Sequence, residues 1–260
     1  MPSLYAFDHQ HLQWDLILQQ NVHLTSNGHA SRVDYANIRS NLAPFELYLE
    51  LLTSVSKNEF NQWSQDEQKA FLINAYNAFT IELILRHYPD IDSIKDIGSF
   101  FINPWKKKFF SLLGKKRSLD ELEHHILRKQ GVYNDPFIHV ALICASIGCP
   151  ALKNEAYTAE KIERQLADSM RRFLSDKERN RYDNESKSLE VSKIFDWYED
   201  DFKKGHRGIF SLNDLFSLYD KELADDKDGQ TRIRSKTINI NYLDYDCNLN
   251  DWHLNNQRLK

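Results

Sequence analysis

The chain has 260 residues, 41% of them hydrophobic, which is enough apolar material to bury a sizeable core without disulfide staples. Its 34 basic and 38 acidic residues give a net charge of −4, so it lacks the basic excess of nucleic-acid-binding proteins. The longest stretch without Asp, Glu, Lys or Arg, residues 136–152, is too short and too interrupted to span a bilayer. We therefore expect a soluble globular protein with no nucleic-acid partner and no transmembrane segment.

Helical spacing dominates the first third of the chain. Apolar periodicity predicts helices over residues 12–20, 44–55 and 65–87, the last of which is capped by Ser64 and ended by Tyr88-Pro89. The helix at 65–87 is apolar on almost every side, so it should be buried.

The pattern changes in the middle of the chain. Two short runs around Gly114 predict a β-hairpin within residues 105–119, and a helix over residues 119–129 follows. Residues 137–144 are interpreted as a buried strand that leads into a loop with the sequence CASIGCP.

The second half alternates polar and amphipathic segments. Thr158 is predicted to cap a long helix, residues 189–194 to form a strand after a polar loop or hairpin tip, and residues 194–202 a short helix. Residues 221–232 are interpreted as a solvated connection. No repeat or linker divides the chain.

The fold class expected from these elements is α+β. It is a single helix-rich domain over residues 1–260, built around a small antiparallel sheet. Its core spans about residues 8–250, and a polar C-terminal tail follows.

Two of the three cysteines, Cys144 and Cys149, stand in the otherwise apolar segment HVALICASIGCPAL at residues 139–152. Three explanations compete: a thiol active site, a metal or disulfide clip, and an ordinary core that contains cysteine. An odd number of cysteines allows at most one disulfide, and these two could form it across their turn. Cys247 is expected to be a lone, inert thiol.

Polar residues interrupt two apolar helix faces. Asn74 and Asn77 lie three residues apart on one face of the helix at 65–87, where they either tie down neighbouring loops or orient a catalytic histidine. Glu123 falls in the middle of the apolar arc of the next helix, with His124 on its flank. A carboxylate that faces a core needs a partner, so we expect Glu123 to be buried and paired.

The partners open to Glu123 are His139, Lys193 and Arg128, in either a structural ion pair or a functional site. On a straight strand His139 and Cys144 would point to opposite faces, which favours His124 as the base for a cysteine nucleophile.

The small residues 145–148 let a substrate approach the cysteine, and Gly148 would let backbone N–H groups turn outward as an oxyanion site. Zinc fits less well, because a C-x4-C pair lacks the usual knuckle spacing. A metal site formed by His124, His139 and a cysteine is a third reading, and we predict neither a metal nor a cofactor.

Several longer motifs occur together and in order: FLINAYNAFTIELILRHYP, SIKDIG, SLDELEHHILR, DPFIHVALICASIGCPAL, AYTAEKIERQL and LEVSKIFDWYEDDF. Over about residues 8–250 they resemble the family known as domain of unknown function 547. The segment YLDYDCNLN resembles the usual ending of that family, with Cys247 where a tryptophan is more typical.

The resemblance implies a single domain and supplies no activity. It also implies export, so that the protein would be periplasmic or secreted with its signal segment absent from this chain; a cytoplasmic location is the alternative. The polar motif residues of the family match the following positions: Asn77, Glu123, His124, His139, Cys144, Ser146, Cys149 and Lys193.

Two functions follow as hypotheses. The first is a thiol-dependent hydrolase or acyl transferase that uses a papain-like set of residues in a different chain order. Cys144 is the nucleophile, His124 is the base, and Glu123 or Asn77 orients His124. An unknown small molecule or peptide would be held by the remaining polar residues, which are His139, Ser146, Cys149 and Lys193. The second is a non-catalytic binding module in which Cys144 and Cys149 form a structural disulfide.

Overall fold

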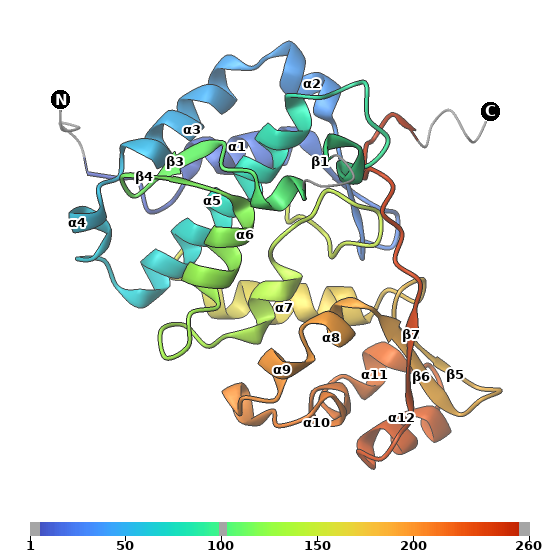
Figure 1. Ribbon diagram of the computed structural model, residues 1–260. Helices are drawn as coiled ribbons and strands as arrows, with labels where there is room; N and C mark the ends of the chain where they lie inside the picture. Colours follow the sequence, from blue (N-terminus) through green and yellow to red (C-terminus); the bar gives the residue numbers. More distant parts are fainter. Residues whose placement is uncertain (1–5, 99–102, 255–260) are drawn as a thin grey trace.

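The computed structural model describes residues 6–98 and 103–254 (Figure 1). Helices predominate in these residues and every strand is short, which confirms the predicted α+β class. No helix in this part of the chain is both long enough and apolar enough to cross a membrane.

Most of the helices are short, and α5 is more than twenty residues long. The N-terminal half contains α1 (Leu12–Asn21), α2 (Tyr35–Ser40), α3 (Ala43–Ser54), α4 (Lys57–Phe60), α5 (Gln65–Leu85) and α6 (Leu119–Leu122). The C-terminal half contains α7 (Ile162–Leu174), α8 (Ile194–Trp197), α9 (Glu199–Phe202), α10 (Leu212–Ser217), α11 (Asp220–Leu223) and α12 (Lys227–Arg234). The helical turns between them are η1 (Ile94–Ile97), η2 (Pro104–Lys106), η3 (Glu123–Leu127), η4 (Pro136–Val140) and η5 (His206–Gly208).

Helix α5 is the centre of the core, as its sequence predicts. Ser64 and Glu67 form a reciprocal capping box at its start, which satisfies backbone N–H groups that have no partner within the helix. From Lys69 to Ile84 every side chain except that of Glu82 is buried. Helices α2, α3, α6 and α7 pack around it (Figure 1).

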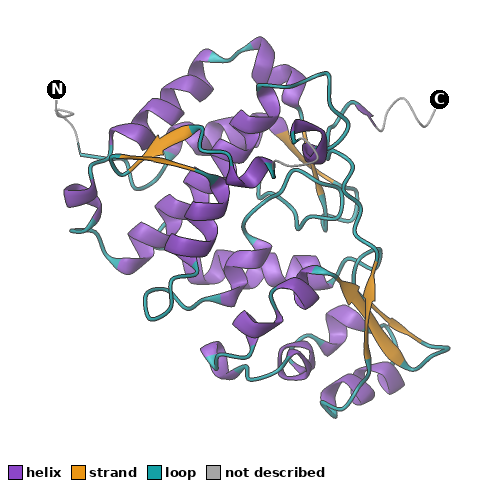
Figure 2. Ribbon diagram, in the orientation of Figure 1, coloured by secondary structure: helices purple, strands orange, loops and turns teal. Residues whose placement is uncertain are grey.

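The strands lie in three small sheets instead of one (Figure 2). The antiparallel pairs are β1 (Val22–Leu24) with β2 (Ser31–Val33), β3 (Phe110–Leu112) with β4 (Lys115–Arg117), and β5 (Arg181–Asp183) with β6 (Ser188–Ser192). Strand β7 (Ile240–Leu243) adds to β6 in parallel. The predicted hairpin around Gly114 is confirmed; Leu113 and Gly114 both have positive φ, as a two-residue hairpin turn requires.

The predicted strand at 137–144 is wrong. These residues begin with the 3-10 helix η4, in which Pro136 occupies the first turn and the Asp135 carboxylate accepts the N–H of Phe137. All residues from 136 to 143 are buried, so no alternation of exposed and buried positions was available to identify a strand.

Two further interpretations need correction. Residues 221–232 are not a loop, because they form the end of α11 and most of α12, with Asp226 as a cap and Ile233 buried behind them. The helix predicted from Thr158 begins only at Ile162, and the Thr158 hydroxyl does not cap it.

The C-terminal segment is part of the core. After β7 it runs back to the N-terminal helices (Figure 1), where residues 245–250 pair with the loop at 145–149. Leu249 and Asn250 are buried, and the tail expected beyond them falls partly on residues 255–260, which lie outside the described residues. Segments far apart in sequence therefore meet at one place.

Candidate active site

A cavity of about 500 Å³ opens where η3, the 139–149 segment, the start of α8 and the C-terminal segment meet. Seven of the eight predicted site residues line it: Glu123, His124, His139, Cys144, Ser146, Cys149 and Lys193. Aromatic side chains form much of the remaining wall, namely Tyr76, Trp105, Trp197, Tyr198 and Tyr245. The wall combines aromatic surface with many polar and charged side chains, and a cavity of this size is typical of a small-molecule site.

The two cysteines of the loop face each other at this cavity. Both thiols are free, and their sulfurs lie 2.8 Å apart. Cys144 is half-buried at the cavity wall, whereas Cys149 is buried. The Sγ of Cys149 also accepts the backbone N–H of Cys144 at 2.9 Å.

Hydrogen bonds favour the thiolate form of Cys144. The neighbouring Cys149 thiol contributes most, and together with Tyr245, whose hydroxyl lies 2.8 Å from Sγ, and Ser146 it lowers the pKa of Cys144 to about 7. Burial acts in the opposite direction and raises the pKa of Cys149 well above its usual value. One thiol of the pair is therefore activated and the other is not.

Three N–H groups of the backbone predicted as an oxyanion site, those of Ile147, Gly148 and Cys149, donate to carbonyls of the protein, whereas the N–H of Ser146 hydrogen-bonds to the Cys144 sulfur. The N–H groups of Ile147 and Gly148 donate to the carbonyls of Asn248 and Asp246, both at 2.8 Å. Gly148 does not have positive φ; its hydrogen is needed because a Cβ would lie 3.0 Å from the Asp246 backbone. The strained position in this loop is Ala145, at φ 58, directly after Cys144.

Asn77 does not line the cavity but holds the segment that carries Cys144. Its amide nitrogen donates to the carbonyl of Ala141 at 2.9 Å, and its oxygen accepts the N–H of Ile143 at 3.0 Å. Asn74, one turn earlier, makes the same pair of bonds to the N–H and carbonyl of Tyr157. The prediction that a buried amide of α5 reaches the Cys144 segment is confirmed for Asn77.

Glu123 is buried, as the helix periodicity predicts. Its carboxylate accepts the hydroxyl of Tyr76 at 3.2 Å and that of Tyr198, and it lies 3.9 Å from a nitrogen of both His124 and His139. It stands at the first position of η3, a single turn of π-helix, which is a distortion that often marks functional sites. Lys193 is not its partner.

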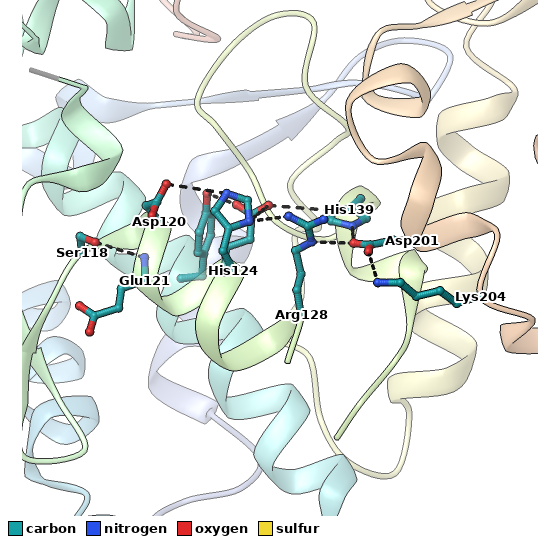
Figure 3. A network of polar contacts seen from close by, with 10 residues as sticks. Ser118, Asp120, Glu121, His124, Arg128, His139, Asp201 and Lys204 are labelled. Carbon is teal, nitrogen blue, oxygen red and sulfur yellow. Dashed lines mark hydrogen bonds and ion pairs between the residues drawn. The ribbon is translucent and has the colours of Figure 1, made fainter. Parts of the chain in front are cut away.

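His124 is not placed to be the base for Cys144. Its Nδ1 lies 2.6 Å from a guanidinium nitrogen of Arg128, which can only donate, so Nδ1 is an occupied acceptor (Figure 3). Its Nε2 lies 3.8 Å from Asp120. Within the described residues no hydrogen bond joins Cys144 to a histidine, because η3 holds His124 against Arg128 instead.

His139 belongs to a buried ion-pair network that the sequence did not reveal. Its Nε2 donates to Asp201 at 2.7 Å (Figure 3). Its ring also stacks on Tyr198, with 3.7 Å between the ring centroids. Burial lowers the pKa of His139, so the imidazole is the neutral donor of this bond. The same carboxylate accepts Arg128 at 2.6 Å and Lys204 at 2.6 Å.

The expectation that His139 and Cys144 face apart is wrong, because the segment between them is not a straight strand and both residues line the cavity. The third reading, a metal site, gains no support from the part of the chain described, where no three His, Cys, Asp or Glu side chains converge as ligands would.

Tyr76, Tyr198, Asp201 and Tyr245 were missed from sequence. Tyr198 and Asp201 stand three apart in the segment YEDDF, so one helical face carries both. Tyr245 stands in YLDYDCNLN, a segment noted above only for its likeness to a family ending.

Residues 60–174 match the family model described as "Protein of unknown function, DUF547". The match confirms the resemblance for that part of the chain, which is somewhat less than half of it and includes Asn77, Glu123 and both cysteines of the loop. The walls contributed by Tyr198 and Tyr245 lie outside the matched residues. No curated protein and no solved structure matches the chain.

Proposed function

We propose that the cavity is the active site of a thiol-dependent hydrolase or acyl transferase, with Cys144 as the nucleophile. The observation that carries this proposal is a half-buried thiol at a cavity wall that hydrogen-bonds to Cys149, Ser146 and Tyr245. A thiolate present at neutral pH attacks a carbonyl carbon without a base beside it, which removes the need for His124 in this step.

The reaction begins with attack of the Cys144 sulfur on the carbonyl carbon. The leaving group departs with a proton taken from solvent water, and water or a second acceptor then cleaves the thioester and releases Cys144 as the thiolate. The hydroxyl of Tyr245, 2.8 Å from Sγ, stabilises that thiolate before attack. The cavity volume suits a small molecule or the end of a peptide.

The family resemblance also predicts that the protein is exported to the periplasm or secreted, and this location stays a prediction.

The test is alkylation of the reduced, native protein with iodoacetamide, followed by peptide mapping. We expect Cys144 to react first, with a rate that rises through an apparent pKa of about 7, because the thiolate is the reactive form. Cys144→Ser should remove the fast reaction, and Cys247→Ser, the matched control, should leave it unchanged. Slow labelling of Cys144 with no inflection near neutral pH would contradict the proposal. So would a stable disulfide that reductant does not open in the native protein, as the binding-module reading requires.

Lys193 gives the cavity a charge that a substrate can use. Among the described residues its ammonium group has no hydrogen-bond or ion-pair partner, although it lines the cavity. Asp244, on the same wall, is exposed and likewise lacks a partner in the described part of the chain. We propose that Lys193 attracts an anionic group of the substrate toward Cys144.

Charged alkylating reagents test this without knowledge of the substrate. We expect Lys193→Met to lower the rate of iodoacetate relative to iodoacetamide at Cys144 by about two- to five-fold, the effect of one nearby charge in water. Asp244→Asn should change the same ratio in the opposite direction. A ratio that neither variant moves would show that these charges do not act at the thiol.

A further inference from the structure

The distance between the two sulfurs is set by the backbone of the loop. Residues 147 and 148 donate to the C-terminal segment, and the guanidinium of Arg179 donates to the carbonyls of Ile147 and Cys149. The N–H of Cys149 donates to the carbonyl of Ser146 at 3.1 Å, which closes the turn. Cys144 and Cys149 are therefore held together whether or not their side chains attract each other.

The separation of 2.8 Å needs little change to become a covalent bond. A disulfide has a sulfur–sulfur length of about 2.05 Å, so closure moves the two atoms by less than about 1 Å in total. Rotation of the side chains supplies such a shift, and the hydrogen bonds that hold the loop stay intact.

The two thiols differ in their access to solvent. Both cysteines line the cavity, but Cys144 is half-buried there and open to a small oxidant, whereas Cys149 is only 4% exposed. An oxidant therefore reaches Cys144 first, and the nearest thiol to the oxidised sulfur is Cys149. This is the arrangement of an attacking thiol with a resolving thiol behind it.

We propose that Cys144 and Cys149 form a reversible disulfide that switches the nucleophile off under oxidising conditions. The proposal rests on the function proposed above, since it takes Cys144 to be the reactive thiol. Cys144 attacks an oxygen of hydrogen peroxide, which gives a sulfenic acid and one water. The Cys149 thiol then attacks that sulfur and expels a second water. The dithiol loses two electrons and two protons, and an external thiol reductant returns them.

The experiment treats the reduced full-length chain with one equivalent of hydrogen peroxide. We expect loss of two hydrogen atoms by mass spectrometry and a Cys144–Cys149 cross-link in the peptide map. Alkylation of Cys144 by iodoacetamide should fall by a factor of roughly ten or more and return after dithiothreitol. Cys149→Ser should trap the sulfenic acid at Cys144, where dimedone captures it, and Cys247→Ser should behave as the parent protein does.

Two outcomes separate the failure of this proposal from failure of the proposed function. If Cys144 reacts with iodoacetamide but peroxide gives sulfinic acid there and leaves Cys149 free, the switch is overturned and the nucleophile remains. If Cys144 reacts with neither reagent, the proposed function falls and the switch falls with it. Circular dichroism of each variant establishes that it is folded before its reactivity is compared.

Discussion

Replacing Asp201 by asparagine is expected to lower the free energy of unfolding by about 1.5–3 kcal/mol, because the buried His139 and the partly buried Arg128 lose charge-assisted hydrogen bonds. The carboxylate accepts charge-assisted bonds from Arg128 at 2.6 Å, Lys204 at 2.6 Å and the neutral ring of His139 at 2.7 Å. Burial acts to raise its pKa, but the bonds from His139, Arg128 and Lys204 outweigh burial and hold that pKa well below its usual range. Asparagine keeps the shape and removes the charge.

Urea unfolding of the two proteins measures this effect, with Asp200→Asn as the matched control because its side chain is exposed. A carboxyl group with a lowered folded-state pKa contributes stability that is fully present above about pH 4 and is lost as the pH falls through that folded-state pKa. The difference in the free energy of unfolding between the parent protein and Asp201→Asn should therefore become smaller as the pH falls in the acid range. If Asp201→Asn and Asp200→Asn lower the free energy of unfolding equally at pH 7, the hydrogen bonds to Asp201 contribute no more stability than an exposed surface charge does.

Asn77→Leu is expected to cost about 2–5 kcal/mol, because leucine has a similar volume and leaves a buried carbonyl and a buried N–H without partners. Asn74→Leu is a matched control on the same face of α5, since it loses the same two kinds of bond, to Tyr157. Both variants should be destabilised by similar amounts in urea.

The two variants should differ at the thiol. Asn77 bonds to Ile143, directly before Cys144, so Asn77→Leu should also move the pH midpoint of Cys144 alkylation upward as the loop loses its geometry. Asn74→Leu should leave that midpoint near 7. If both variants shift the midpoint equally, Asn77 acts through global stability and is not a positioning residue.

Local sequence signals were enough to predict α5, its buried amides and the buried position of Glu123. Glu123 interrupts an apolar arc of helical period, whereas α5, apolar on almost every side, is recognisable from its length, its Ser64 cap and the proline that ends it. The same logic failed at 137–144, where an apolar run buried on all sides has no preferred period. The local cap at Asp135 and the tertiary bonds from Asn77 decide that geometry.

The chemistry of the site could be predicted only in part. Cys144 and Cys149 are five residues apart, so their meeting follows from a turn, whereas Asp201 joins His139 across 62 positions and Tyr245 joins Cys144 across 101. Contacts of that separation leave no trace in a local pattern. The strand expected at 137–144 favours His124 as the base because it would face His139 away from Cys144, but that strand does not form and the π-helical turn directs His124 to Arg128.

The C-terminal position of Tyr245 also orders events during synthesis. The chain is made from its N-terminus, so Cys144 is translated 101 residues before the phenol that bonds to its sulfur. Until the segment after β7 returns to the N-terminal helices, the thiol lacks that donor and the cavity lacks one wall. We therefore expect the surroundings of the Cys144 thiol to be completed only when nearly the whole chain has been translated and folded, so that the thiol of a nascent chain is less reactive than that of the finished protein.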